Sequence, residues 1–272
     1  MNPYYENKNG KLYHGDCVEI SKTLPDNCID LVITSPPYDD MREYKGYSFD
    51  FEKTAVELLR IVKEGGVVVW VVGDATNNGS ETGTSFKQAL YFKEIGFNIH
   101  DTMIYHKKNA PPTGAMHPRY YSCFEYIFVF SKGKPKTFNP IMVDRQNKQK
   151  YKEKERIMAV TREKDGSFIK RKVNFEGKVK KTNMFSYNTG GGVSVPVGIE
   201  HPATFPKNLA YDQAISWSDE GDVIYDPLAG SGTTLIVAES KKRKWIAGEI
   251  SEEYCQVIQK RVKKEEKRFK LV

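Results

Sequence analysis

The sequence has no continuous apolar run that could cross a membrane. Such a span needs roughly 20 apolar residues. The first residues, Met1 to Lys11, are polar and lack the apolar region of a secretory signal. We therefore expect a soluble intracellular protein. Its 272 residues, 39% of them hydrophobic, are enough for one α/β domain and a small insert.

The sequence also lacks the ligand spacing that metal sites and redox pairs show. The cysteines and histidines are Cys17, Cys28, Cys123, Cys255, His14, His100, His106, His117 and His201. The four cysteines lie far apart, with no paired spacing that would suggest a zinc site or a redox pair. We expect reduced, mostly buried cysteines and no bound metal.

The excess of positive over negative charge is confined to one segment of the chain. The net charge of the protein is +7, and residues 132–181 contain 17 Lys and Arg against 6 Asp and Glu. A local positive field of this kind is typical of a segment that binds a polyanion, because neutralised phosphates dominate the affinity. The alternative is a solvated surface that keeps the protein soluble.

Short runs rich in β-branched residues predict strands that are covered on both faces. These runs are 30–34, 66–72, 222–225 and 245–248. Segments with helical periodicity lie between and after them, at 54–63, 85–94, 233–240 and 252–268. Strands that alternate with helices predict an α/β fold with a doubly wound, mostly parallel sheet.

One region departs from this alternation. Residues 98–106 and 123–130 are two strand-like runs with no helix between them, which predicts an antiparallel hairpin at a sheet edge. The following segment, 133–196, loses clear periodicity and contains most of the excess basic residues. We interpret this segment as an inserted module, so that the chain divides into 1–132, the insert 133–196, and 197–272.

A glycine-rich turn follows the predicted strand 222–225. The sequence D-P-L-A-G-S-G-T-T runs from Asp226 to Thr234 and leads into a predicted helix. Gly230 and Gly232 allow the backbone to approach a ligand closely. By itself the turn is compatible with a dinucleotide site or a phosphate loop. However, the third glycine of the former and the lysine of the latter are missing.

Two acidic residues favour a different ligand. Asp226 directly precedes the turn, and Glu249 ends the next predicted strand. Carboxylates here would repel a pyrophosphate but could bind an amine or ribose hydroxyls. They therefore favour a cationic, sugar-bearing ligand such as S-adenosylmethionine. The alternatives are a helix cap for Asp226 and a surface acid for Glu249.

The segment Ser35-Pro36-Pro37-Tyr38 follows a predicted buried strand, at the sheet edge where ligands bind in such folds. Two prolines make the turn rigid and fix the Ser35 hydroxyl relative to the Pro36 carbonyl. An exocyclic amino group is a weak nucleophile, and two acceptors at its hydrogens would turn its lone pair toward a methyl donor. Tyr38 could stack on a base extruded from the duplex. Without the glycine-rich turn, a rigid turn with a filler tyrosine would be the simpler interpretation.

Together these motifs resemble those of the amino-methyltransferases of restriction-modification systems, in the circularly permuted group whose catalytic motif precedes the cofactor motif. The resemblance covers nearly the whole chain outside 133–196. It implies a DNA methyltransferase that acts by base flipping, with Ser35, Pro36, Pro37 and Tyr38 as catalytic residues. In this family the strands near the two ends of the chain become neighbours in the sheet.

The resemblance also implies a cofactor, S-adenosylmethionine. Asp16 lies in the segment H-G-D-C that would contact the adenine, and Phe205 in the segment H-P-A-T-F-P that would close over the methionine end. The full set of cofactor-binding residues that the resemblance implies is Asp16, Asp226, Pro227, Leu228, Gly230, Ser231, Gly232, Thr233, Glu249 and Phe205.

The residue at position 35, a serine, indicates which base is methylated. Cytosine-N4 enzymes of the family that the chain resembles usually carry serine at this position, whereas adenine-N6 enzymes carry an acidic residue or asparagine. The segment around Phe205 also resembles that of the cytosine-N4 enzymes more closely than that of the adenine-N6 enzymes. We therefore expect methylation of cytosine N4. The alternatives are an adenine-N6 methyltransferase and a nucleic-acid-binding protein that keeps the fold but has lost catalysis.

The basic insert is expected to recognise the target sequence, because Lys and Arg hold phosphates and some side chains contact base edges. The candidate DNA-binding residues of the insert are Arg145, Arg162 and Arg171. Lys107, Lys108 and Arg119 are candidates in the loop 106–121, which is expected to lie close to the catalytic edge and to pack on the extruded nucleotide. The expected partners are double-stranded DNA and a cognate restriction endonuclease that acts separately, with no membrane. We expect a monomer or homodimer in the cytoplasm of a prokaryotic cell, encoded by the cell or by a phage.

Overall fold

The computed structural model describes residues 1–37, 49–110, 118–144, 158–172, 177–188 and 206–269. The chain divides into two compact units, one formed by Met1–Asn139 with Asn183–Val272 and the other by Pro140–Thr182. The second, called the basic unit below, lies inside the predicted insert 133–196, whose flanks belong to the first unit. Tyr38, Arg145 and Phe205, which the sequence assigns to sites, lie outside the described residues.

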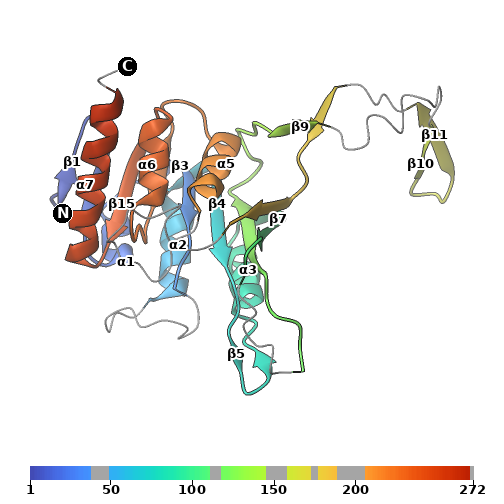
Figure 1. Ribbon diagram of the computed structural model, residues 1–272, viewed down its shortest axis with the longest axis horizontal. Helices are drawn as coiled ribbons and strands as arrows, with labels where there is room; N and C mark the ends of the chain where they lie inside the picture. The colour runs from blue at the N-terminus through green and yellow to red at the C-terminus, as the bar shows by residue number, and fades with distance from the viewer. Residues whose placement is uncertain (38–48, 111–117, 145–157, 173–176, 189–205, 270–272) are drawn as a thin grey trace. The chain divides into compact units, whose positions relative to one another are not determined.

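The first unit is built on a mixed sheet (Figure 1). In their order across the sheet the described strands are β1 (Tyr5–Glu6), β2 (Gly10–His14), β15 (Lys244–Glu249), β14 (Val223–Asp226), β3 (Ile29–Thr34), β4 (Val62–Val72), β8 (Phe124–Ser131), β7 (Asn98–Lys107) and β13 (Met184–Tyr187). The five strands from β2 to β4 run parallel, and β8 is antiparallel to both β4 and β7. The predicted fold class, a mostly parallel α/β sheet with an antiparallel hairpin, is confirmed.

The hairpin β7–β8 differs from the prediction in its position. It does not form the edge of the sheet, because β13 pairs in parallel with β7 on the outer side. The sequence of β13 is the four-residue run M-F-S-Y, inside a segment without periodicity. A run of four residues is too short for an alternation of apolar and polar residues to predict a strand.

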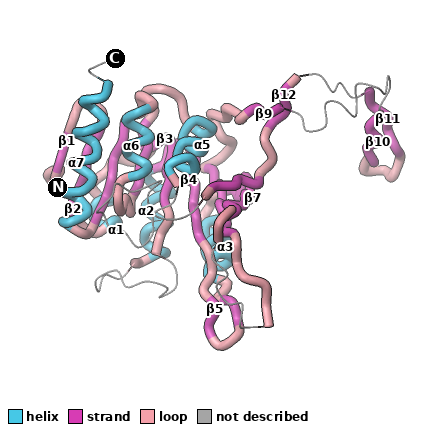
Figure 2. Tube along the Cα trace, in the orientation of Figure 1, coloured by secondary structure: helices cyan, strands magenta, loops and turns pink. Residues whose placement is uncertain are grey.

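Two layers of helices cover the sheet, one on each face (Figures 1 and 2). One layer holds α1 (Cys17–Lys22), α2 (Phe51–Ile61) and α3 (Thr84–Glu94), and the other holds α5 (Lys207–Trp217), α6 (Thr233–Ser240) and α7 (Glu252–Phe269). Coverage of both faces explains why the central strands are continuously apolar rather than alternating. None of the described helices has the length and apolar character of a membrane span.

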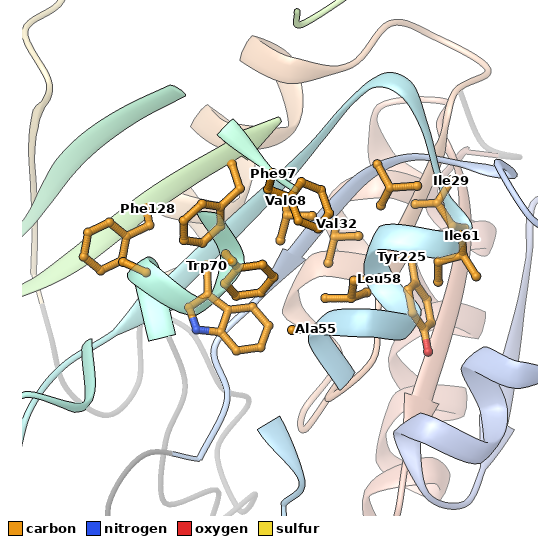
Figure 3. Packing of buried hydrophobic residues seen from close by; sticks show 14 of the residues in the cluster. Ile29, Val32, Ala55, Leu58, Ile61, Val68, Trp70, Phe97, Phe128 and Tyr225 are labelled. Atoms are coloured by element: carbon orange, nitrogen blue, oxygen red, sulfur yellow. The ribbon is translucent and has the colours of Figure 1, made fainter. Parts of the chain in front are cut away.

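A large apolar core lies between the sheet and helices α2 and α3 (Figure 3). The Trp70 ring of β4 lies 5.1 Å from that of Phe92 in α3, and the Trp70 indole N–H donates to the side-chain oxygen of Gln88 at 2.8 Å. Each large side chain buried in this way contributes about 1.5–3 kcal/mol of hydrophobic free energy. These contacts pack α3 against β4.

Strands from the two ends of the chain meet at one end of the parallel region, beside β1. β15 pairs with β2 in a register that places Glu249 beside His14. The Gly15 N–H donates to the Glu249 carbonyl at 2.9 Å and continues this pairing past the strand end. The expected proximity of the strands near the two chain ends is confirmed.

The basic unit contains two short antiparallel ladders among its described residues. One pairs β9 (Met142–Asp144) with β12 (Lys178–Lys180), and the other pairs β10 (Met158–Arg162) with β11 (Phe168–Lys172). No side chain that the structure describes between residues 140 and 182 is buried. Among those described residues the unit therefore has no apolar core of its own, and it differs in kind from the first unit.

Candidate active site

The carboxyl ends of β2, β15, β14 and β3 lie at one edge of the sheet, called the carboxyl edge below. Four predicted site residues lie at this edge: Asp226 and Glu249 are the last residues of their strands, Ser35 follows β3, and Asp16 lies two residues beyond β2. Loops at the carboxyl ends of parallel strands are where open α/β sheets bind ligands. The fold thus gathers two motifs that are far apart in the sequence.

The predicted catalytic segment, of which Ser35-Pro36-Pro37 is described, leaves β3 directly after Thr34. Thr34 is paired with Trp70 of β4 and is fully buried. Pro36 is buried, whereas Ser35 and Pro37 are half-buried. The segment is therefore anchored at its start and exposes part of Ser35 at the carboxyl edge. This exposure is what a group that meets a substrate requires.

Asp226, at the end of β14, is a buried carboxylate with 2% of its surface exposed. Its Oδ1 accepts the Thr34 hydroxyl at 2.8 Å and the Leu228 N–H at 3.2 Å. Burial raises the pKa of Asp226 to about 6, against the opposing effect of the hydroxyls of Thr234 and Thr34. Asp226 thus joins the glycine-rich turn to the strand that carries Ser35.

The glycine-rich turn has the backbone geometry that its glycines permit. Gly230 and Gly232 have φ values of 52° and 79°, in the left-handed region that other residues avoid. A Cβ atom on Gly232 would lie 2.9 Å from a side-chain carbon of Ile258 in α7, so this position also has no room for one. Gly232 is the N-cap of α6, and the turn therefore places the start of that helix at the carboxyl edge.

Glu249 is held by the same turn. Its Oε2 accepts the Gly230 N–H at 2.7 Å, and its Oε1 accepts the Ser251 N–H at 2.8 Å. Only 7% of the residue is exposed, which excludes the alternative of a surface acid. Burial raises the pKa of Glu249 to about 7, because the two N–H donors only partly compensate for the lost solvation.

Asp16 begins helix α1. Its Oδ1 accepts the N–H groups of Val18 and Glu19 at 2.8 and 3.1 Å, which is the hydrogen bonding of an N-cap. The residue is half-buried, so part of its surface remains available at the carboxyl edge. In this structure Asp16 stabilises a helix, and a cofactor contact would be a second role.

The donor set fits a cationic ligand that carries hydroxyl groups. Within the described residues, neither Asp226 nor Glu249 forms an ion pair with Lys or Arg. Two buried carboxylates without a positive partner leave a favourable place for external positive charge and for hydroxyl donors. S-adenosylmethionine supplies both. Within the same residues there is no group of three or more His, Cys, Asp and Glu that could hold a metal ion.

Two residues at this edge were not predicted from the sequence. The Thr234 hydroxyl, in the first turn of α6, donates to the Ile33 carbonyl of β3 at 3.4 Å. The Arg261 guanidinium, in α7, donates to the carbonyl of Ser231 in the turn. Thr234 is the last residue of the glycine-rich segment 226–234, and its place in that segment is a signal that could have indicated it. Arg261 lies in a run of charged residues, where no local signal separates it from its solvated neighbours.

The predicted DNA-binding residues of the first unit differ in their surroundings. The Lys107 Nζ lies 2.6 Å from Oε1 of Glu125 on the neighbouring strand β8, so its charge is already paired. Lys108 is exposed. The Arg119 guanidinium donates to Thr76 Oγ1 at 3.1 Å and to the Gly79 carbonyl at 2.6 Å, and so holds the small hairpin of β5 (Thr76–Asn77) and β6 (Ser80–Glu81).

Arg162, in the basic unit, is exposed at the end of β10, and its guanidinium lies 6.0 Å from the centre of the Phe168 ring. Arg171 lies in β11, opposite Ala159 in the register. Both belong to the β10–β11 hairpin, whose two strands together contain Arg162, Lys170, Arg171 and Lys172.

Comparison with known protein families gives a match over most of the chain. The model of the DNA methylase family matches residues 29–260. This range includes both Ser35-Pro36-Pro37 and the glycine-rich turn. The chain belongs to the DNA methylase family.

Curated relatives of this DNA methylase include two proteins of Bacillus amyloliquefaciens. The protein is 50% identical over 248 residues to the orphan methyltransferase M.BamHII, covering 90% of this chain and 92% of the relative. It is 29% identical over 292 residues to the type II methyltransferase M.BamHI, covering 100% of this chain and 61% of that relative.

Solved structures with the same fold include other DNA methylases. The PvuII DNA methyltransferase (cytosine-N4-specific) matches with a TM-score of 0.71 and 20% identity, over 96% of this chain and 89% of that one. A putative DNA modification methylase of Thermus thermophilus, complexed with S-adenosyl-L-methionine, matches with a TM-score of 0.61 and 23% identity, over 94% of this chain and 95% of that one. At these identities the likeness shows the fold.

Proposed function

We propose that this DNA methylase transfers a methyl group from S-adenosylmethionine to the exocyclic N4 of cytosine in double-stranded DNA, at specific sites and by base flipping. The observation that carries the proposal is the meeting of Ser35-Pro36-Pro37 with the glycine-rich turn at one sheet edge. Serine at position 35 supports cytosine rather than adenine. One structure of similar fold is named as cytosine-N4-specific, but at 20% identity it supports the fold and not the base.

The catalytic role falls to the rigid segment after β3. The Ser35 hydroxyl and the Pro36 carbonyl accept the two hydrogens of the target amino group, and these bonds tighten as the nitrogen becomes tetrahedral. Pro37 holds Pro36 in an extended conformation, so neither acceptor has to be reorganised. Tyr38 stacks on the flipped base and offsets part of the unstacking free energy.

The cofactor supplies an activated methyl group on a sulfonium. The residues proposed to hold it are Asp16, Asp226, Pro227, Leu228, Gly230, Ser231, Gly232, Thr233 and Glu249 of the carboxyl edge, together with Phe205. Glu249 accepts ribose hydroxyls, which replace the solvent that its carboxylate has lost. Asp16 contacts the adenine while it continues to cap α1.

The basic unit is proposed to recognise the target within the insert 133–196, between a catalytic part, 1–132, and a cofactor-binding part, 197–272. Its 14 Lys and Arg against 6 Asp and Glu support contact with phosphates. Lys108, Arg145, Arg162 and Arg171 are proposed to contact DNA. Lys107 and Arg119 would have to exchange their present partners for phosphate.

The order of the motifs supports assignment to the circularly permuted group. The catalytic segment after β3 precedes the cofactor turn after β14, and β2 lies beside β15. The relatives named as type II methyltransferases support action in a bacterial restriction-modification system. We further propose that the protein acts in the cytoplasm and with a separate endonuclease.

The proposal is tested by identifying the methylated nucleoside. Genomic DNA from a methylation-deficient bacterium is incubated with the protein and S-adenosylmethionine, digested, and separated by mass spectrometry. N4-methylcytosine is expected in the wild-type reaction and not with Ser35→Ala. Appearance of N6-methyladenine would overturn the choice of base, and absence of any methylated nucleoside would overturn the proposed activity.

A further inference from the structure

The carboxyl ends of β3 and β14 are held together by side chains rather than by the sheet. Backbone pairing between the two strands covers Leu31 with Ile224 and Val32 with Tyr225. Beyond this point each strand is paired on its other side, Thr34 with Trp70 of β4 and Asp226 with Ala247 of β15. The two strand ends that carry the catalytic segment and the glycine-rich turn are therefore not paired with each other.

We propose that the hydroxyls of Thr34 and Thr234, together with the Asp226 carboxylate, form a bridge that sets the position of Ser35 relative to the glycine-rich turn. Thr34 and Thr234 are thus positioning residues for methyl transfer. This inference rests on the proposed function of the same site. It assigns a role to Thr234, and it gives Thr34 and Asp226 a task other than direct contact with the cofactor.

Two crossing hydrogen bonds make the bridge. Thr34, on β3, donates to Asp226 at 2.8 Å, and Thr234, on α6, donates to the Ile33 carbonyl at 3.4 Å. They run in opposite directions between the same two segments. Asp226 Oδ1 also accepts the Leu228 N–H at 3.2 Å, which extends the link into the turn.

The bridge is buried and therefore rigid. Thr34 and Thr234 are 0% and 2% exposed, and Asp226 is 2% exposed. In such an environment water does not compete for the bonds, and an unpaired donor or acceptor is costly. Burial raises the pKa of Asp226, while the hydroxyls of Thr234 and Thr34 favour its charged form. Loss of the Thr34 hydroxyl therefore raises this pKa further.

The position of the bridge explains why the site needs it. The chain leaves β14 for α6 in one helical layer, whereas the helix after β3 is α2, in the other layer (Figure 1). At such a switch point the two turns diverge, and the crevice between them is where ligands bind. Methyl transfer needs the amino nitrogen and the methyl carbon within about 3–3.5 Å, and a misplacement of about 1 Å can cost about 100-fold in rate.

The test uses Thr34→Val, which keeps the size and β-branching of the side chain and removes its hydroxyl. We expect kcat to fall about 10- to 100-fold, while the Kd for S-adenosylmethionine stays within about threefold. Thr34→Ser retains the hydroxyl and is expected to restore most of kcat. Thr54→Val is the matched control, because Thr54, in α2, is also fully buried and its hydroxyl donates to a backbone carbonyl, that of the N-cap residue Asp50.

The readouts separate positioning from general destabilisation. An unchanged kcat in Thr34→Val overturns the bridge. So does an equal loss of cofactor affinity, which would make Thr34 a binding residue, or an equal loss of kcat in Thr54→Val. In Thr34→Val the acidic limb of the kcat profile is expected at higher pH, because the pKa of Asp226 rises.

Hydrogen exchange tests the bridge without turnover. On addition of S-adenosylmethionine to the wild-type protein, slower amide exchange is expected in the turn and also at Ser35, whereas in Thr34→Val only the turn is slowed. Equal slowing at Ser35 in both proteins contradicts the bridge. A wild-type protein that binds the cofactor and shows this coupling but methylates no DNA would refute the proposed function and leave the bridge standing.

Discussion

The carboxyl edge and the basic unit differ in how their charged residues are placed. At the edge, Asp226 and Glu249 are 2% and 7% exposed, and backbone N–H groups or a hydroxyl hold each carboxylate in one position. The basic unit contains 14 Lys and Arg but only 6 Asp and Glu, and none of the side chains that the structure describes there is buried. The first region is built for precise geometry and the second for summed charge.

This difference predicts how each region responds to change. A buried, fully bonded group cannot relax, so a single substitution at the edge removes a whole function. Exposed cations act through a long-range field that salt screens, so each one contributes a small and nearly additive share of the affinity for DNA. Larger effects in the basic unit than at the carboxyl edge would contradict this difference between the two regions.

The largest effect is expected for Ser35→Ala. Removal of one of the two proposed acceptors should lower single-turnover methyl transfer by at least about 100-fold, because the remaining acceptor cannot orient the amino group alone. Binding of S-adenosylmethionine and of DNA, measured by calorimetric titration, should stay within about threefold. Ser131→Ala is the control, since Ser131 is a buried serine at the end of the antiparallel strand β8, at the opposite edge of the sheet. A comparable loss of cofactor binding in Ser35→Ala would contradict a purely catalytic role.

The second effect concerns Glu249 and pH. Its pKa is raised from 4.5 to about 7 by burial, so the folded chain binds this proton more tightly than the unfolded chain. The free energy of unfolding should therefore fall as pH rises from about 5 to about 8, by up to about 3 kcal/mol for this residue. Glu249→Gln should show a smaller fall in urea denaturation at the two pH values. Identical pH dependence of the two proteins would mean that Glu249 is solvated in solution.

An intermediate effect is expected for Asp16→Ala, which should weaken cofactor binding by about 1–3 kcal/mol, the free energy of a lost charged hydrogen bond. The same substitution removes a helix cap and should lower stability by about 1 kcal/mol. Asp50→Ala separates the two effects, because Asp50 caps α2 in the same way through the Lys53 N–H at 3.1 Å. Titration of both variants with S-adenosylmethionine should show lost affinity in the first alone. Equal affinities would remove Asp16 from the cofactor site.

The smallest effect is expected in the basic unit. Arg162→Ala should lower affinity for DNA a few-fold and reduce the slope of log K against log salt by about 0.9, the share of one phosphate contact. Cofactor affinity should not change. Lys93→Ala, an exposed lysine of α3, is the control for the loss of one positive charge. Fluorescence anisotropy over a salt series measures both slopes. A loss confined to one DNA sequence, with an unchanged slope, would make Arg162 a base-reading residue.

The sequence predicted those parts of the fold that depend on local pattern. Helix α6 begins and ends where the periodicity of Thr233–Ser240 does, since a glycine-rich turn precedes it. The apolar runs of β3, β4, β14 and β15 predicted buried parallel strands because only strands covered on both faces are continuously apolar. The acids at the ends of β14 and β15 were therefore placed at the right edge.

What the sequence could not predict depends on contacts between distant residues. Thr34 and Asp226 are separated by 192 positions, and no local pattern indicates that one donates to the other. Lys107 was assigned to DNA as a cation near the active site. The register of β7 on β8 places Glu125 beside Tyr105 and within reach of Lys107. Strand β13 was not predicted for a related reason. It is a strand because it pairs with β7, and its own sequence does not indicate this pairing.

The pairing of β2 with β15 has a consequence for biosynthesis. Gly10–His14 leaves the ribosome early, but its parallel partner Lys244–Glu249 follows only after most of the other strands have been made. Until then β2 can pair only with β1 in this sheet order, and Glu249 is missing from the carboxyl edge. Contacts of such long sequence separation form late. If Glu249 holds the cofactor as proposed, the nascent protein gains this part of its cofactor site only after nearly the whole chain has been synthesised and folded.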